Sequence, residues 1–260
     1  MNIIIRKQLT FIFRCILVFM LIVSCQSEKR KKTPLNPPSE IKPTENVICP
    51  LAVGNYWTYI DSSIGFYDYQ ADTSKLEITG KTTISFDNQV IEVFFWNWIN
   101  LKTKIPEDWK WLNRNEDDGL WTYGILSSTD TLLVKNLDIK YPIELSESWK
   151  SVLIYDSFKV SDTLTITCIG IEEPFKTPLG IFYCYVYYYK MPYPLQRSWH
   201  KFGLPQKQFR LIIEKMDSRL IKDEFYLFLD PQVGYVGMVE IVNGVLVWKK
   251  VLLDYSVRLE

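Results

Sequence analysis

The sequence predicts an all-β domain built from one antiparallel, curved sheet, either a half-barrel or a sandwich. Apolar and polar residues alternate through most of the chain after Val47, and β-branched and aromatic residues dominate the alternating segments. Turn-forming residues separate these segments, and strands do not alternate with helices as they do in doubly wound folds. With 260 residues, 47% of them hydrophobic, the chain has enough apolar side chains for one sizeable core.

About a dozen short strands with turns between them are expected, the number and spacing of a sandwich or barrel. They cover residues 56–60, 75–85, 89–99, 109–113, 120–126, 131–134, 148–154, 163–171, 180–190, 224–229, 235–242 and 245–255. Asn243-Gly244 between the last two strands is a strong hairpin signal. The two prolines of the segment 173–178 predict another turn. Residues 208–222 fit a helix or a hairpin, and we favour the hairpin.

The segment Ile181–Tyr189 carries apolar or aromatic side chains at both alternating sets of positions. A strand that is apolar on both faces is expected to be central in its sheet and covered on both sides.

The first 24 residues have the pattern of a secretory signal peptide. Arg6, Lys7 and Arg14 are positive, and no acidic residue lies among them. The apolar run Cys15–Val23 follows, and it is about half the length that a membrane-spanning helix needs. An uncleaved anchor beginning at Ile3 would reach spanning length, but it would place the three positive side chains in hydrocarbon.

The apolar run ends in Leu21-Ile22-Val23-Ser24-Cys25. This segment resembles the lipobox of bacterial lipoproteins, an aliphatic and a small residue before the cysteine that receives the lipid. The resemblance implies that Cys25 becomes the first mature residue and carries the acyl chains that anchor the protein to membrane lipid. Gln26 follows instead of Asp, which favours the outer membrane over the inner membrane of the cell envelope.

Residues 26–47 are predicted to be a flexible linker. They include four prolines, no aromatic residue and few apolar residues, so they cannot bury enough surface to fold. The basic run 29–32 lies close to Cys25 and is either a contact with anionic headgroups or an ordinary solvated charge run. The domains are therefore a signal peptide (1–24), a lipidated cysteine with its linker (25–47) and a single β domain (48–260).

Charge and composition exclude several classes of function. The β domain has 22 Lys and Arg against 27 Asp and Glu, so it lacks the basic surface that nucleic-acid binding requires. The single histidine, His200, argues against histidine catalysis and multi-histidine metal sites. Glu116-Asp117-Asp118 lacks the ligand spacing of a calcium loop and is interpreted as a solvated turn. We expect no cofactor, no metal and no enzymatic activity.

Three short motifs in the β domain resemble those of uncharacterised bacterial lipoproteins. The first is the opening Pro50-Leu51-x-Val53-Gly54-Asn55-x-Trp57, and the second is Thr177-Pro178-Leu179-Gly180-Ile181-Phe182-x-Cys184. The third is Asp230-Pro231-Gln232-Val233-Gly234-Tyr235-Val236, with Leu253-x-Tyr255 near the end, and its Asp230-Pro231-Gln232 departs from the family pattern. The resemblance implies an exported β fold and carries no known chemistry.

Cys49, Cys168 and Cys184 remain in the β domain, so at least one of them is unpaired within the chain. Cys168 and Cys184 are symmetric about residue 176 and would face each other if the hairpin turned there. They form either a disulfide, which an oxidising compartment allows, or two small buried side chains.

Tryptophans crowd two neighbouring predicted strands. Trp96 and Trp98 share one face of the first strand, and Trp109 and Trp111 share one face of the second. If exposed, these four side chains form a flat platform for a sugar or an apolar ligand; if buried, they are core. Trp57 and Trp149 each follow a Pro, an aliphatic residue and a polar turn, and a Trp at the start of a strand can fill one end of the core.

Three functions are compatible with this sequence. The first is a lipid-anchored, non-enzymatic binding or assembly module of the cell envelope, with an envelope protein or a glycan as its partner. The second is a carrier of an apolar ligand or a lipoprotein, for which a half-barrel would enclose a cavity of several hundred Å³. The third is a glycan-binding lipoprotein, for which Trp96 and Trp98 would have to be exposed.

Overall fold

The protein is built around a single antiparallel sheet. The computed structural model describes residues 47–64, 69–103, 105–106, 109–155, 159–191 and 222–258. They all belong to one compact unit, Lys42–Glu260, and the other unit, Met1–Ile41, lies outside the described residues. The strands are β1 (Tyr56–Ile64), β2 (Tyr69–Phe86), β3 (Gln89–Asn100), β4 (Ile105–Pro106), β5 (Trp109–Glu116), β6 (Gly119–Ser127), β7 (Thr131–Lys140), β8 (Ser148–Tyr155), β9 (Lys159–Thr177), β10 (Gly180–Lys190), β11 (Asp223–Asp230), β12 (Gly234–Val242) and β13 (Val245–Ser256).

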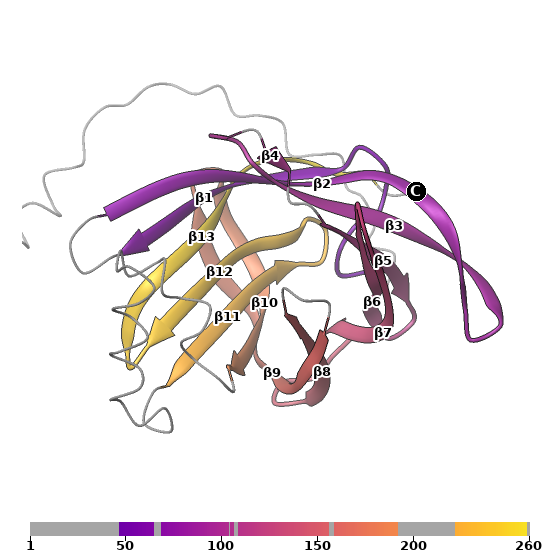
Figure 1. Ribbon diagram of the computed structural model, residues 1–260. Helices are drawn as coiled ribbons and strands as arrows, with labels where there is room; N and C mark the ends of the chain where they lie inside the picture. The colour runs from indigo at the N-terminus through magenta and orange to yellow at the C-terminus, as the bar shows by residue number, and fades with distance from the viewer. Residues whose placement is uncertain are drawn as a thin grey trace, which may run out of the picture. The chain divides into compact units, whose positions relative to one another are not determined.

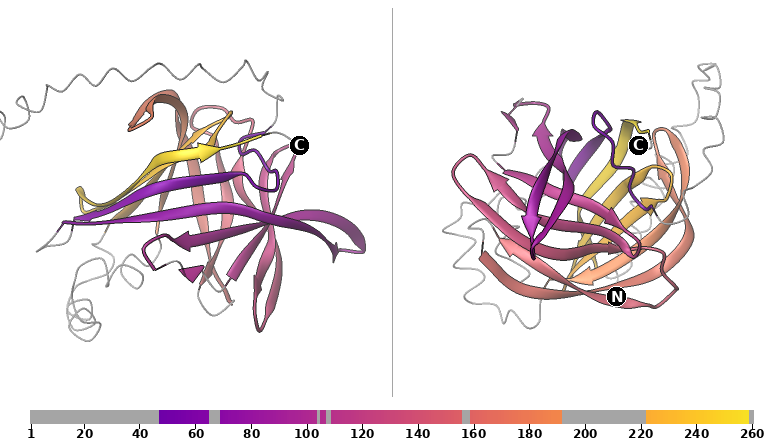
Figure 2. Two further views of the ribbon diagram at one scale, coloured as in Figure 1. Left: turned by 90° about the horizontal axis from the view of Figure 1, so that it is seen from above. Right: turned by 90° about the vertical axis from the view of Figure 1, so that its right-hand side faces the viewer.

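The chain starts in the middle of the sheet, runs to one edge, continues at the other edge and returns to the middle. The order is β7-β6-β5-β3-β2-β1-β13-β12-β11-β10-β9-β8, and the short β4 pairs with β3 beside this path. The sheet curls until its two edge strands, β7 and β8, approach each other (Figures 1 and 2). The prediction of an all-β, antiparallel, curved sheet is confirmed, and the sheet is a nearly closed barrel and not a sandwich.

The twelve predicted strands all lie within observed ones, but the turn predicted at residues 173–178 is wrong. β9 continues to Thr177 and pairs with β10 from Thr177 opposite Gly180 onward, so the turn lies at Pro178 and Leu179. Pro174 is tolerated inside the strand because, within the described residues, β8 pairs with β9 only as far as Thr167. The second half of β9 is therefore an edge, where a missing backbone N–H costs no ladder hydrogen bond.

The expectation that both faces of Ile181–Tyr189 are covered is also wrong. Cys184 and Tyr187 are fully buried, but Ile181 is 60% exposed and Tyr183 is 62% exposed. β11 ends at Asp230 and pairs with β10 only from Tyr185 onward, so the start of β10 extends beyond it. A single curved sheet covers its concave face, and the described residues form no second layer over the convex one.

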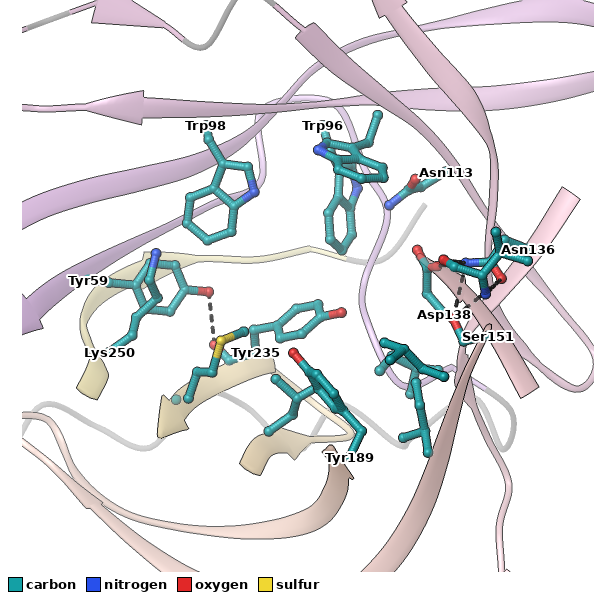
Figure 3. A pocket seen from close by; sticks show the side chains of 18 residues that line it. Tyr59, Trp96, Trp98, Asn113, Asn136, Asp138, Ser151, Tyr189, Tyr235 and Lys250 are labelled. Atoms are coloured by element: carbon teal, nitrogen blue, oxygen red, sulfur yellow. Dashed lines mark hydrogen bonds between the residues drawn. The ribbon is translucent and has the colours of Figure 1, made fainter. Parts of the chain in front are cut away.

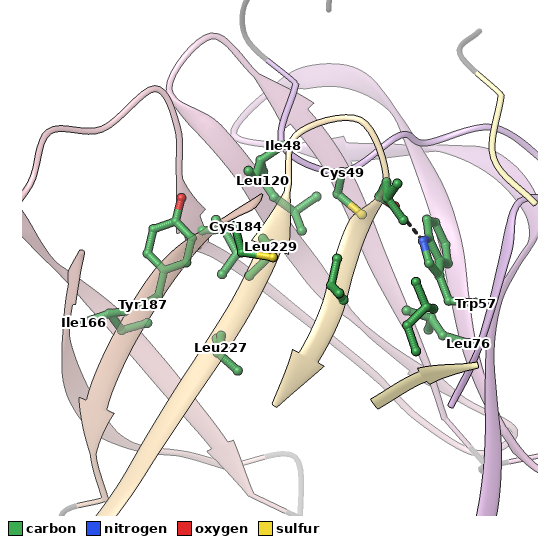
Figure 4. Close-up of a cluster of buried hydrophobic side chains, with 14 of the residues drawn as sticks. Ile48, Cys49, Trp57, Leu76, Leu120, Ile166, Cys184, Tyr187, Leu227 and Leu229 are labelled. Carbon is green, nitrogen blue, oxygen red and sulfur yellow. Dashed lines mark hydrogen bonds between the residues drawn. The ribbon is translucent and has the colours of Figure 1, made fainter. Parts of the chain in front are cut away.

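The segment before β1 fills one end of the barrel. Ile48, Cys49 and Ala52 are completely buried, and Figure 4 shows Ile48 and Cys49 among the other core side chains. Asn55 is buried as well, and its side chain donates to the carbonyl of Pro50 (3.1 Å) and accepts from the backbone N–H of Arg258 (3.0 Å). These bonds join the start of the domain to its end.

Trp57 and Trp149 both lie in the core, where they were expected to fill space. The Trp57 indole is fully buried and donates to the carbonyl of Val233 at 2.6 Å (Figure 4). The Trp149 indole is 8% exposed and donates to the carbonyl of Leu137 at 3.0 Å. Each side chain therefore combines a large apolar contact with a satisfied N–H group.

Several predictions fall on residues that are not described. The signal peptide, Cys25, the linker up to residue 46, His200 and all of the segment 208–222 except Lys222 lie outside the described residues. In the part of the chain that the structure does describe, no helix combines the length and the apolar character needed to span a membrane.

Candidate functional site

The concave side of the sheet contains a pocket with a volume of about 310 Å³. The pocket is the candidate site because residues of β1, β3, β5 and β7 to β13 converge on it (Figure 3). Its lining consists of Tyr59, Trp96, Trp98, Trp111, Asn113, Asn136, Asp138, Ile139, Ser151, Val152, Leu164, Ile166, Tyr189, Leu227, Tyr235, Gly237, Met238 and Lys250. The volume lies at the lower end of the range of about 300–1,000 Å³ that small-molecule sites occupy.

Aromatic side chains form much of the pocket wall. Trp96, Trp98 and Trp111, which the sequence singled out as a ligand platform or as core, line the pocket, whereas Trp109 lies outside the lining. Trp96 and Trp111 are paired across β3 and β5. Trp96 is only 5% exposed, so these rings face the interior of the sheet and do not form a flat outer surface.

One end of the pocket is polar. Asn113 on β5, Asn136 and Asp138 on β7 and Ser151 on β8 meet there (Figure 3). Asp138 is the extra residue of a β-bulge, because Leu120 pairs with Ile139 while the adjacent Trp121 pairs with Leu137. A bulge re-aims the side chains next to it, which explains why Asp138 and its neighbour Ile139 both reach the pocket.

Asn136 joins the two edge strands of the sheet at this end. Its Oδ1 accepts from the backbone N–H of Val152 at 2.6 Å. Its Nδ2 donates to Ser151 Oγ at 3.1 Å and to Asp138 Oδ1 at 2.6 Å. Because a backbone N–H can only donate, it fixes which way the amide faces, and the NH₂ group is therefore directed at Asp138.

Burial raises the pKa of Asp138 from 3.8 to about 6, against the opposing effect of hydrogen bonds from Thr122 and Asn136. The Thr122 hydroxyl lies between two acceptors, Asp138 Oδ2 and, at 2.9 Å, Asn113 Oδ1. A hydroxyl has one proton, so it cannot donate to both. A protonated Asp138 resolves this conflict, because it donates to Thr122, which then donates to Asn113. A protonated Asp138 is therefore compatible with both the geometry and the raised pKa.

The other end of the pocket holds a cation that is already neutralised. Lys250 Nζ lies 3.2 Å from Asp61 Oδ1, 3.1 Å from Ser74 Oγ and 3.9 Å from the centre of the Trp98 ring. The side chains of Lys250 and Asp61 are only 13% and 17% exposed. Figure 3 shows Lys250 with Tyr59 and Trp98, away from Asp138.

Two further polar groups, the Tyr235 hydroxyl and the Trp96 indole N–H, belong to side chains of the pocket lining. Burial, followed by the nearby charge of Asp138, raises the pKa of Tyr235 well above its ordinary value, so its hydroxyl remains a donor. This hydroxyl is directed toward the side of the pocket where Asp138 lies (Figure 3). The indole Nε1 of Trp96 is buried and has no hydrogen-bond partner among the described residues. Such an unpaired buried donor is uncommon and costly unless a ligand or water accepts from it.

Cys168 and Cys184 do not face each other, because the hairpin does not turn at residue 176. Cys168 is paired with Tyr187 and Cys184 with Glu173, because the turn is centred beyond residue 176 and β10 contains bulges. Both thiols are free and buried, as is that of Cys49. Burial raises the pKa of Cys184 to about 12, so this thiol behaves as a small apolar side chain.

The acidic turn at residues 116–118 forms local contacts. Glu116 contacts Lys135 Nζ at 3.0 Å and accepts from the Tyr123 hydroxyl. Asp118 accepts from the Trp121 indole at 2.7 Å. Among the described residues, no group of three or more His, Cys, Asp or Glu side chains is arranged to hold a metal ion.

The polar end of the pocket was not recognised in the sequence. Asn136 and Asp138 lie beyond the strand predicted at residues 131–134, although they belong to β7. The available signal was that the polar residues Asn136 and Asp138 occupy alternate positions shortly after the apolar run 132–134, which is the pattern of a strand whose inward face lines a polar site.

No family model matches the chain, and no curated protein matches its sequence. Two solved structures are similar to it in fold. One is described as "a putative exported protein with YmcC-like fold" from Bacteroides fragilis NCTC 9343, with 12% identity, 81% of this chain and 99% of that chain covered, and a TM-score of 0.43. The other is described as "a putative lipoprotein" from Parabacteroides distasonis ATCC 8503, with 11% identity, the same coverage and a TM-score of 0.40.

Proposed function

We propose that this protein is a lipid-anchored protein of the bacterial cell envelope that binds a small, largely apolar ligand inside its curved sheet. The pocket of about 310 Å³ supports this proposal most directly. Its walls are aromatic and aliphatic, and a few polar groups meet at one end, the composition by which small-molecule sites bind and orient a ligand.

The N-terminal pattern supports the location. A signal peptide that ends in Leu21-Ile22-Val23-Ser24-Cys25 would place the lipid on Cys25, and Gln26 after it favours the outer membrane. The linker of residues 26–47 would hold the β domain away from the bilayer, with its pocket free to exchange ligand with the surrounding solution.

The chemistry of the pocket supports binding over catalysis. Asp138 is the one acidic residue in the described lining, and the nearby Asp61 is paired with Lys250. Glycoside hydrolysis requires two carboxyl groups that flank the substrate at roughly 5–10 Å from each other. The indoles of Trp96 and Trp98 face inward, so a ligand that stacks on them has to enter the pocket.

The test uses N-phenyl-1-naphthylamine, an uncharged dye that fluoresces strongly in apolar surroundings. We expect saturable binding of one dye per protein. Met238→Trp, which fills the pocket from a flexible lining side chain, should abolish this binding. Ile181→Trp, which adds the same ring at an exposed position, should leave it intact. Equal dye binding by both variants, or no saturable binding by the natural protein, would contradict the proposal.

A further inference from the structure

The polar end of the pocket contains a carboxyl group that has no cationic partner. Asp138 is hydrogen-bonded to Asn136 and Thr122, and no Lys or Arg of the described residues forms an ion pair with it. Among the described residues of the lining, Lys250 is the only cation, and it is paired with Asp61 at the other end. An ionised carboxylate in such surroundings is costly unless a positive charge compensates for it.

The walls beside Asp138 suit a cation as well. Trp96 and Tyr235 lie at 79° to each other with their ring centres 5.9 Å apart, and Trp111 and Tyr189 continue the wall. Aromatic ring faces attract ammonium groups within about 6 Å of the ring centre. The protein already uses this interaction at the far end, where Lys250 Nζ lies 3.9 Å from the Trp98 ring centre and 5.2 Å from that of Tyr59.

The unpaired Trp96 Nε1 adds a second requirement. A ligand that satisfies it carries a hydrogen-bond acceptor, such as a hydroxyl or ether oxygen, in addition to its positive charge. The distribution of groups therefore defines a small molecule with an apolar body, one cationic end and at least one oxygen.

We propose that the ligand of this pocket is a small organic amine, bound with its ammonium group against Asp138 and its apolar body against Trp96, Trp111 and Tyr235. This inference rests on the proposed function, because it names the class of molecule that the same pocket binds. In the complex the ionised carboxyl group of Asp138 accepts from the ammonium group, which supplies the positive charge that Asp138 lacks in the free protein.

Tyramine and tyrosol provide the test, because they share an aromatic ring and a phenol oxygen and differ only in an ammonium or a hydroxyl group. Binding is measured by calorimetry at a pH of about 7.5, above the raised pKa of Asp138. We expect tyramine to bind at least about tenfold more tightly than tyrosol, the lower end of what a charge-assisted hydrogen bond contributes.

Asp138→Asn should remove the preference for tyramine, so that the variant binds the two compounds within about twofold of each other, and a cooperative unfolding transition shows that the variant is folded. Asp117→Asn, which removes one negative charge from an exposed turn, is the matched control and should keep the preference. Equal binding of the two compounds by the natural protein, or an unchanged preference in Asp138→Asn, would overturn the inference. If the inference is overturned but the dye still binds, the proposed function stands. If neither the dye nor tyramine nor tyrosol binds, the proposed function and the inference about the amine both fail.

Discussion

The side-chain Oδ1 of Asn136 accepts a hydrogen bond from the backbone N–H of Val152 at 2.6 Å. Asn136 lies on β7 and Val152 on β8, the two edges of the sheet, so a side chain here takes the place of a backbone ladder bond. The contact between these two edge strands is called the seam here, and Trp149 on β8 also crosses it, because its indole donates to the carbonyl of Leu137 on β7. The same amide of Asn136 also binds Asp138, so closure of the sheet and the polar end of the pocket depend on one residue.

Asn136→Ala should lower the free energy of unfolding by about 2–4 kcal/mol, because it leaves the Val152 N–H without its partner and removes one of the two hydrogen bonds of Asp138. Chemical denaturation measures the loss, and amide hydrogen exchange should show faster exchange at Val152. Thr131→Ala, at the exposed start of the same strand, should change stability by less than about 0.5 kcal/mol. A stability loss no larger than that of this control would show that the seam does not depend on Asn136.

Asp138 should make stability depend on pH. Its pKa is about 6 in the folded protein against an ordinary value of 3.8, so between these values the folded protein binds more protons here than the unfolded chain does. Asp138 therefore makes its full contribution to the free energy of unfolding below about pH 4. This contribution is lost as the pH rises to about 6 and is then constant, and the free energy of unfolding falls by about 3 kcal/mol in total.

The measurement is the difference between the natural protein and Asp138→Asn in denaturation experiments from pH 4 to 7. Subtraction removes the effects of Asp72 and Glu147, whose pKa values are lowered by hydrogen bonds from Asn100 and Lys140 and which act in the opposite direction. A difference that does not vary with pH would show that Asp138 is not held in its protonated form.

Trp57→Ala should destabilise the protein by about 3–5 kcal/mol, because it removes a fully buried indole and leaves a cavity at the closed end of the barrel. The carbonyl of Val233 also loses its donor. Thermal unfolding is compared with that of Tyr183→Ala, which truncates a 62% exposed ring and should have little effect. Similar melting temperatures for the two variants would contradict the position of Trp57 in the core.

Cys25→Ala should release the protein from membranes, because the substitution removes the sulfur that would carry the lipid. Cys15→Ala is the matched control, since it changes another cysteine of the same N-terminal segment without altering the lipobox. Partitioning between detergent and aqueous phases measures the effect. Retention of the Cys25→Ala variant in the detergent phase would exclude lipidation at this residue.

The strands were predictable because inward and outward side chains alternate along them, and this pattern needs no knowledge of their neighbours. The prediction stopped early in β7 because Asn136 and Asp138 occupy inward positions where the pattern expects apolar residues. Hydrogen bonds with residues of β6 and β8 satisfy these two side chains, and such partners cannot be inferred from the sequence of one strand. The pocket was therefore missed at the place where it departs from an ordinary core.

The role of the tryptophans could not be decided from spacing alone. Phe94, Phe95 and Trp96 place aromatic rings on both faces of β3, so alternation does not say which face is inward. The direction in which the sheet curls decides which face of β3 points inward. This direction depends on the pairing of β3 with β2 and β5 and on the approach of β7 to β8.

The most direct test of the pocket is a two-dimensional NMR spectrum of the nine tryptophan indole N–H groups, recorded while tyramine is added. The account predicts that the signals of Trp96 and Trp111, which line the pocket, shift and saturate, and that Trp57 and Trp149, whose indoles donate to backbone carbonyls, change little. Tyramine binding that leaves the Trp96 and Trp111 signals unmoved would contradict the account.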